Sequence, residues 1–268
     1  MPTLLILNPN TGQQTSDRLL ALSQAMVGPG IRLRLATARF GARYISDEVS
    51  VAIAAHAALD AYAADTAAHG RPDAVLLACF GDPGLFALRD LAGVPVFGLA
   101  QAAMQQAALR GPFVVVTGGA AWVPMLQRLA LALDVGDALL GVHALDATGG
   151  QIAGQGLAAV PALRHACAQA LQRWPQARSV LLGGAGLAGL AEAVSAVQGV
   201  PVLDNWQLAL QAAMQAALQA TSQVAQPTLP VAHQNAGAGN DQPEAAAGWQ
   251  GLGGDLQCLL QARAEPPQ

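Results

Sequence analysis

The 268-residue sequence contains no lysine, so all 13 of its basic residues are arginine. Without a lysine amine, the chain cannot form a Schiff base with a carbonyl substrate or with pyridoxal phosphate. Charged residues make up only 11% of the chain and the formal net charge is −4. No basic face for phosphates is expected, and we therefore predict no nucleic-acid partner.

Long apolar runs are also missing, although 53% of the residues are hydrophobic. No stretch of about 20 residues is free of Gly, Pro and polar side chains, so we predict no membrane association. The first residues lack a basic segment and enter a strand-like run at once, so we expect no secretory signal. No CxxC pair or histidine cluster indicates a metal site.

Cysteine is scarce, with only Cys79, Cys167 and Cys258. An odd number of widely spaced cysteines is typical of a reducing compartment rather than of a disulfide framework. We therefore expect a soluble cytoplasmic protein. Cys167 and Cys258 fall in stretches of helical pattern, where we interpret them as packing residues.

Short apolar runs alternate with Ala- and Leu-rich stretches of helical length, such as Ser46–Ala68 and Leu157–Trp174. Strands that are apolar on both faces and alternate with helices are typical of a parallel sheet covered on both sides. The predicted fold class is therefore α/β. The expected strands read TLLIL, IRLRLA, AVLLA, PVFGL, FVVVT, LLGVHAL, SVLLG and PVLDN.

One phrase occurs twice: residues 75–85 read VLLACFGDPGL and residues 180–190 read VLLGGAGLAGL, and each is followed by a Val-Pro-Val strand. The repeat predicts two pseudo-symmetric lobes with an active site between them, unless it reflects only the general likeness of βαβ units. We expect a first lobe over 1–103, with a 205–220 helix packing back on it, and a second lobe over 104–204. A Gln-, Ala-, Pro- and Gly-rich linker is expected over 221–250, followed by a C-terminal helix over 251–264.

Ligands of open parallel sheets bind beyond the carboxyl ends of the strands. If the lobes face each other, four strand-end turns meet in one cleft, with backbone N–H groups that suit a carboxylate, imide or ureide. Phosphate is less favoured, because neither GxGxxG nor GxxxxGK[ST] follows a strand. The predicted binding residues are Asn10, Thr11, Phe80, Gly81, Thr117, Gly118, Gly119, Gly184 and Ala185.

Cys79 is the predicted catalytic residue, because it ends an apolar strand and precedes a turn. At a helix N-terminus the pKa of a thiol falls, and the thiolate could act as a nucleophile or a proton carrier. The alternative is a buried, inert cysteine. Asp82 is expected to cap the helix that follows.

The phrases ILNPNT, ACFGDPGL, VVTGG and VPVLD, in this order between Leu4 and Ala217, resemble the aspartate/glutamate/hydantoin racemase superfamily. The hydantoin and allantoin racemase branch is the nearest match. The resemblance implies two similar α/β lobes, a small-molecule substrate, no cofactor and frequent homo-oligomers. It also implies two cysteines flanking the substrate, and Cys79 matches the first.

The second cysteine of the resemblance is missing, because Gly184 stands in its place. Gln101 likewise stands where the branch usually has Glu. Inverting a carbon acid needs a base on one face and an acid on the other. A single thiol returns the proton to the same face by default, so inversion would need a water, another side chain or rotation of the substrate. The resemblance nevertheless implies, as the function expected first, a racemase or epimerase acting on a hydantoin- or allantoin-like amino-acid derivative. The Gly184→Cys change should then create or strongly raise racemisation.

Two other interpretations stay open. The arylmalonate decarboxylase branch of the superfamily also has one cysteine opposite a glycine, but in the second lobe, so this chain would be its mirror image. Loss of CO2 needs only one proton donor, which fits a single thiol. The last interpretation is a binding protein that has kept the cleft and lost the chemistry.

Overall fold

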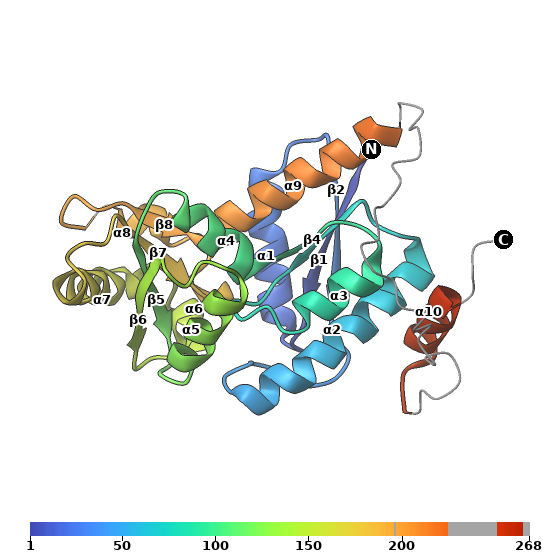
Figure 1. Ribbon diagram of the computed structural model, residues 1–268, viewed down its shortest axis with the longest axis horizontal. Coiled ribbons are helices and arrows are strands. Elements are labelled where there is room, and N and C mark those ends of the chain that lie inside the picture. Colours follow the sequence, from blue (N-terminus) through green and yellow to red (C-terminus); the bar gives the residue numbers. More distant parts are fainter. Residues whose placement is uncertain (196, 225–250, 265–268) are drawn as a thin grey trace.

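The computed structural model describes residues 1–195, 197–224 and 251–264, which form two four-stranded sheets (Figure 1). The first sheet has the order β2-β1-β3-β4, with β1 Thr3–Asn8, β2 Arg32–Thr37, β3 Ala74–Leu77 and β4 Val96–Gly98. The second has the order β6-β5-β7-β8, with β5 Phe113–Gly118, β6 Leu139–Leu145, β7 Ser179–Gly183 and β8 Val202–Asp204. All six pairings are parallel, and the second sheet repeats the strand order of the first.

The central strands are buried on both faces, which is why their sequences are continuously apolar rather than alternating. Leu4–Leu7 of β1 and Val75–Leu77 of β3 are fully buried, and so are Phe113–Val116 of β5. The edge strand β2 is only half-buried. The α/β class and the two-lobed architecture predicted from this pattern are confirmed.

Helices cover each sheet. Around the first sheet lie α1 Gln13–Met26, α2 Glu48–His69 and α3 Leu85–Ala92. Around the second lie α5 Trp122–Ala132, α6 Gly149–Gln155, α7 Val160–Arg173 and α8 Ala191–Val194, with 3₁₀ turns at Gly156–Ala159 and Ala185–Leu187. The long α2 starts where Asp47 accepts a hydrogen bond from the Ser50 N–H at 2.8 Å, which satisfies an otherwise unpaired donor.

Two helices cross between the lobes and pack against each other, α4 Leu99–Ala108 and α9 Asn205–Val224 (Figure 1). Helix α4 follows the first sheet but also contacts β7 of the second, whereas α9 follows the second sheet and packs mainly on β3, β4 and β1 of the first. The α9 residues Ala209, Leu210 and Ala213 are fully buried. One hydrophobic core therefore runs through both lobes at this junction.

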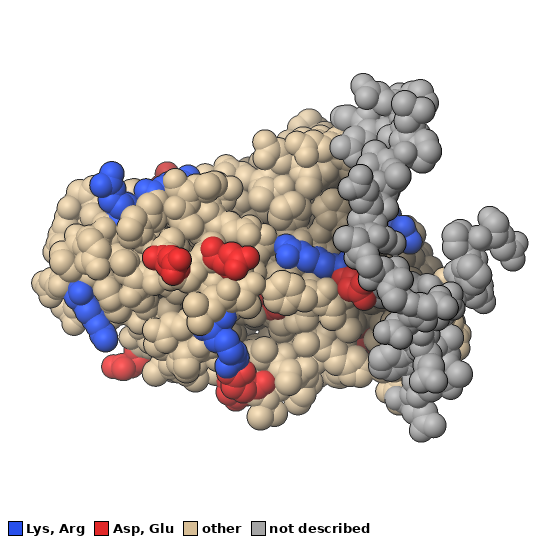
Figure 2. All heavy atoms as spheres, in the orientation of Figure 1, with Lys and Arg blue, Asp and Glu red and all other residues tan. Residues whose placement is uncertain are grey.

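Helix α10, Gly254–Ala264, packs on α2, with Leu256 buried. Helix α9 extends to Val224, and the remainder of the predicted 221–250 linker lies outside the described residues. Figure 2 shows one face of the molecule, on which charged side chains are scattered among uncharged ones. Of the helices that the structure describes, none is long and apolar enough to cross a membrane.

Candidate functional site between the two sheets

A cavity of about 810 Å³ lies where the carboxyl ends of the central strands of both sheets meet. The turns after β1, β3, β5 and β7 all contribute to its wall. Eight of the predicted site residues line it: Asn10, Thr11, Cys79, Phe80, Thr117, Gly118, Gly184 and Ala185. The structure thus brings position 79 of the first lobe and position 184 of the second to one cavity.

Gly81 and Gly119, also expected at the site, do not line this cavity. The α-carbon of Gly81 faces Trp122, and a Cβ there would lie 2.4 Å from Cζ3 of the indole ring. Gly119 has a positive φ of 92°, which glycine adopts without strain. Both positions therefore serve the close packing and the turn beside the cavity rather than its surface.

The turn after β1 is held by a buried side chain, Asn8. Its amide nitrogen donates to Oγ of Ser16 at 2.8 Å and to Oδ1 of Asn10 at 3.1 Å. Oδ1 of Asn10 also accepts from the backbone N–H of Gly12 at 2.9 Å. Because this oxygen is already occupied, Asn10 is left to offer its amide nitrogen to a ligand.

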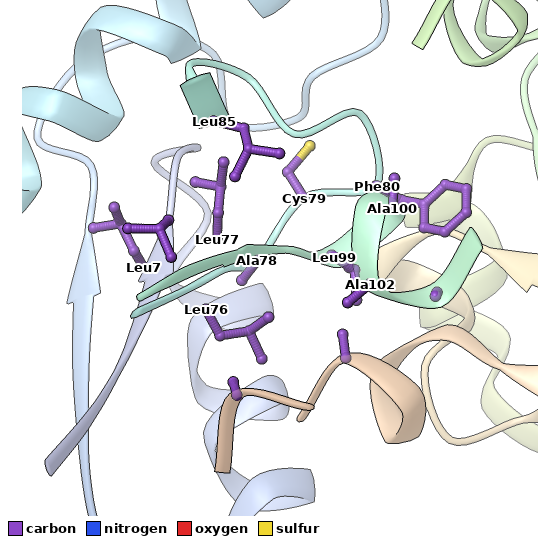
Figure 3. Packing of buried hydrophobic residues seen from close by; sticks show 14 of the residues in the cluster. Leu7, Leu76, Leu77, Ala78, Cys79, Phe80, Leu85, Leu99, Ala100 and Ala102 are labelled. Carbon is purple, nitrogen blue, oxygen red and sulfur yellow. The ribbon is translucent and has the colours of Figure 1, made fainter. Parts of the chain in front are cut away.

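Cys79 lies on the turn after β3, within the hydrophobic core that runs through both lobes (Figure 3). Its side chain is 7% exposed and lines the cavity. Burial raises the pKa of the thiol, and the nearby Asp82 carboxylate raises it further. The expected lowering of this pKa by a helix N-terminus is wrong, because α3 begins only at Leu85, after a further turn.

Asp82 does not cap α3, as the sequence suggested, but instead holds the start of α4. Its Oδ1 accepts from the N–H of Ala100 at 3.0 Å and its Oδ2 from the N–H of Gln101 at 2.6 Å. Burial nevertheless raises the pKa of Asp82 to about 7. The side chain of Gln101 accepts from Arg89 at 2.8 Å, so Gln101 belongs to the support of the Cys79 turn rather than to the cavity wall.

Gly184 matches Cys79 in the repeat but has a different backbone. Its φ of 140° and ψ of 137° form a combination that residues with side chains rarely adopt. A Cβ there would meet only Cδ1 of Leu187, at 3.2 Å. The Asn205 amide donates to the carbonyl oxygens of Leu182 and Gly184, the latter at 3.0 Å, and so fixes the turn. Space for a side chain is present, but the backbone favours glycine.

Several residues that line the cavity were not predicted from the sequence, notably Arg18, Arg43, Tyr44 and Trp122. Trp122 is the first residue of α5, and its place directly after the Thr117–Gly119 turn is a signal that could have identified it. Arg18 lies on α1, and Arg43 and Tyr44 lie in the loop 38–47 between β2 and α2. Nothing local in that loop predicts that it reaches the other lobe.

The charged side chains that line the cavity are all positive. Two arginines, Arg18 and Arg43, line it, and no Asp or Glu occurs among its described lining residues. Arg18 donates to the carbonyl oxygens of Gly186 and Ala188 at 2.8 and 2.7 Å, which joins α1 to the second lobe. For the Arg43 guanidinium, the structure gives no ion-pair partner among the described residues. The cavity therefore favours an anion or polarised carbonyl groups over a cation.

The other two cysteines lie away from the cavity. Cys167 of α7 is buried as expected, and burial raises the pKa of its thiol to about 12. Cys258 of α10 is exposed, so its interpretation as a packing residue is wrong. Within the described part of the chain, no group of three or more His, Cys, Asp or Glu side chains is placed to hold a metal ion.

Two similar parallel sheets with a thiol-containing cavity between them define the class of protein, a two-lobed α/β enzyme of the racemase type. A profile of the Asp/Glu/Hydantoin racemases matches residues 4–213, and the chain belongs to this family. It is 28% identical over 212 residues to the hydantoin racemase of Paenarthrobacter aurescens, covering 78% of this chain and 89% of the relative.

Solved structures agree with this assignment. Allantoin racemase from Klebsiella pneumoniae superimposes with a TM-score of 0.74 at 26% identity, covering 86% of this chain and 95% of that one. A double mutant of arylmalonate decarboxylase superimposes with a TM-score of 0.61 at 18% identity, covering 81% and 93%. The second likeness is one of fold alone.

Proposed function

We propose that this protein is a cofactor-independent racemase or epimerase that acts on a hydantoin- or allantoin-like amino-acid derivative through proton transfer at Cys79. The observation that carries the proposal is a buried thiol facing a cavity that has two arginines and no acidic side chain among its described lining residues. The names of the related hydantoin and allantoin racemases support the same substrate class.

The charge of the cavity argues for a ring-closed or acylated substrate rather than a free amino acid. A free amino acid carries an α-ammonium group, whose burial needs an anionic partner. No Asp or Glu lines the described wall to supply one. A hydantoin or ureide carries carbonyl groups and at most a negative charge, which Arg43, Thr117 and the Asn10 amide can receive.

Cys79 acts in this proposal as the carrier of the Cα proton on one face of the substrate. The thiolate accepts the proton, and the electron pair of the broken C–H bond moves into an enolate that hydrogen-bond donors in the cavity stabilise. Burial raises the pKa of the thiol, so the resting group is protonated and ready to donate. To act as a base, Cys79 must first lose its proton and react as the less populated thiolate.

The test is deuterium exchange at Cα in D2O, followed together with optical rotation, for hydantoin and allantoin enantiomers. The wild-type protein should exchange and racemise, and Cys79→Ser should lose activity by at least about 100-fold, because a hydroxyl is a much weaker acid than a thiol. Cys258→Ser is the matched control, since it removes an exposed thiol far from the cavity. Full activity in Cys79→Ser would overturn the proposal.

A second candidate function is decarboxylation of an arylmalonate-like acid. It is favoured by one specific observation, a single thiol in a cavity whose other lobe presents the backbone of Gly184. Loss of CO2 leaves an enolate that needs one proton from Cys79. Incubation with an aryl-methylmalonate should then release CO2 and give a 2-arylpropionate with an enantiomeric excess. Absence of CO2, with racemisation of hydantoins, would decide for the first function.

A further inference from the structure

The cavity contains a second proton-bearing group, the hydroxyl of Tyr44. This residue belongs to the loop 38–47 of the first lobe, yet its oxygen accepts a hydrogen bond from the backbone N–H of Gly149 in the second lobe at 2.9 Å. A Cβ on Gly149 would lie 3.1 Å from the same oxygen. The first lobe thus delivers a phenol to the wall formed by the second.

That wall is also where Gly184 lies. Cδ1 of Leu187 would be 3.2 Å from a Cβ on Gly184 and 3.9 Å from a Cβ on Gly149. The Tyr44 hydroxyl contacts Gly149, and the Leu187 side chain lies between Gly149 and Gly184 on this wall. Cys79 is near enough for its charge to raise the pKa of Tyr44. Both groups line the same cavity and both belong to the first lobe, Cys79 on the turn after β3 and Tyr44 in the loop 38–47 that reaches the second lobe.

The hydroxyl proton of Tyr44 is free for a ligand. The Gly149 N–H donates a hydrogen bond to the Tyr44 oxygen. The indole N–H of Trp122 is a second donor to this oxygen, and an indole side chain cannot accept the hydroxyl proton in return. Among the described residues, the structure gives the hydroxyl no acceptor for its own proton. Donors directed at the oxygen also stabilise the phenolate that remains after the proton has left.

The loop holds Tyr44 in place from both sides. The carbonyl oxygen of Ala42 accepts from the Thr11 N–H at 3.0 Å, and Ile45 is buried. A proton carrier must be positioned before the substrate arrives, and these contacts supply that positioning. Burial raises the pKa of Tyr44, so its resting form is the neutral phenol, which is the form that donates.

We propose that Tyr44 is the second proton carrier of this site and replaces the missing cysteine on the substrate face opposite Cys79. The inference rests on the proposed racemase function. In one direction the Cα–H bond breaks, the proton passes to the Cys79 thiolate, and the electron pair forms an enolate. The O–H bond of Tyr44 then breaks, its proton bonds to Cα from the other face, and a phenolate remains. The reverse direction starts from the thiol and the phenolate, so no other reactant is needed.

The test compares Tyr44→Phe with Tyr62→Phe, because the chain has only these two tyrosines. Tyr62 is buried away from the cavity, and its hydroxyl donates to the Ala92 carbonyl at 3.0 Å. Each variant loses one hydroxyl and keeps its ring. Both are assayed in D2O for Cα exchange and for loss of optical activity, with thermal unfolding as the check on folding.

Tyr44→Phe should reduce racemisation by about 100-fold or more and keep exchange with retention within about threefold, because Cys79 still removes and returns the proton on its own face. Tyr62→Phe should leave both rates unchanged. Unchanged racemisation in Tyr44→Phe would overturn the inference. An equal fall of exchange and racemisation would also overturn it, since a positioning role predicts that result. If wild-type protein neither exchanges nor racemises, the proposed function fails first, and the inference fails with it.

Discussion

Replacing Gly184 tests whether the turn after β7 differs from the Cys79 turn in its backbone conformation or only in the side chain that it carries. At φ 140° a residue with a Cβ is strained by about 1–3 kcal/mol. The Leu187 methyl at 3.2 Å adds little, because it is the end of a flexible side chain. Gly184→Ala should therefore lower the unfolding free energy by about 1–3 kcal/mol, or Tm by roughly 2–12 °C at this chain length.

Thermal and urea unfolding of Gly184→Ala against wild type measures this cost. The matched control is Gly28→Ala, because Gly28 is exposed, has no positive φ and has no atom within 4 Å of the place that a Cβ would take. That control should change stability by less than about 0.5 kcal/mol. If Gly184→Ala were as stable as Gly28→Ala, the turn would not be held in its glycine conformation, and our account of the asymmetry would be wrong.

Gly184→Cys extends the same test to catalysis. It carries the strain of the alanine variant, so its rate is compared with Gly184→Ala rather than with wild type. A second thiol in the cavity should raise racemisation above the alanine variant by roughly tenfold or more, and should restore it in a Tyr44→Phe background. Identical rates in the two Gly184 variants would show that position 184 does not face the substrate.

Two further predictions concern charge. The pKa of Asp82 is raised to about 7 in the folded protein against about 3.9 unfolded, so the native state holds a proton that the unfolded chain lacks between these values. The free energy of unfolding should therefore fall by up to about 4 kcal/mol as the pH rises from about 4 to 7. Urea titrations at several pH values measure this dependence, and Asp82→Asn should remove it. The same pH dependence in Asp82→Asn and in wild type would contradict a buried, protonated Asp82. Arg43 lines the cavity, so Arg43→Gln should raise KM by about 10-fold or more with little change in kcat. The control Arg110→Gln removes an exposed arginine and should change neither constant. An equal effect of the two substitutions would show that Arg43 does not bind the substrate.

The fold was predictable because burial on both faces leaves a direct mark on sequence. The continuous apolar runs at Leu4–Leu7 and Val75–Leu77 are buried strands, and the repeated phrase marks two sheets of the same strand order. Some helix boundaries differ by a few residues from those predicted, because the residues of a turn before a helix resemble those of the helix itself. Helix α7 starts at Val160 rather than Leu157, because a 3₁₀ turn precedes it.

The site was predictable only where its residues follow strands. Cys79 and Gly184 stand at equivalent strand ends, so topology alone brings them to one cavity. Tyr44 reaches the cavity from a ten-residue loop, 38–47, whose path depends on contacts with the other lobe. The errors at Cys79 and Asp82 have one cause. The length of the turn after β3 and the partner of a buried carboxylate are tertiary properties that adjacent residues do not encode.

The exchange of α4 and α9 makes each half of the polypeptide dependent on the other. A fragment ending near residue 110 would lack the α9 side chains that cover β3 and β1, and would present α4 without the β7 surface it contacts. Such a fragment could bury those faces only by pairing with a twin.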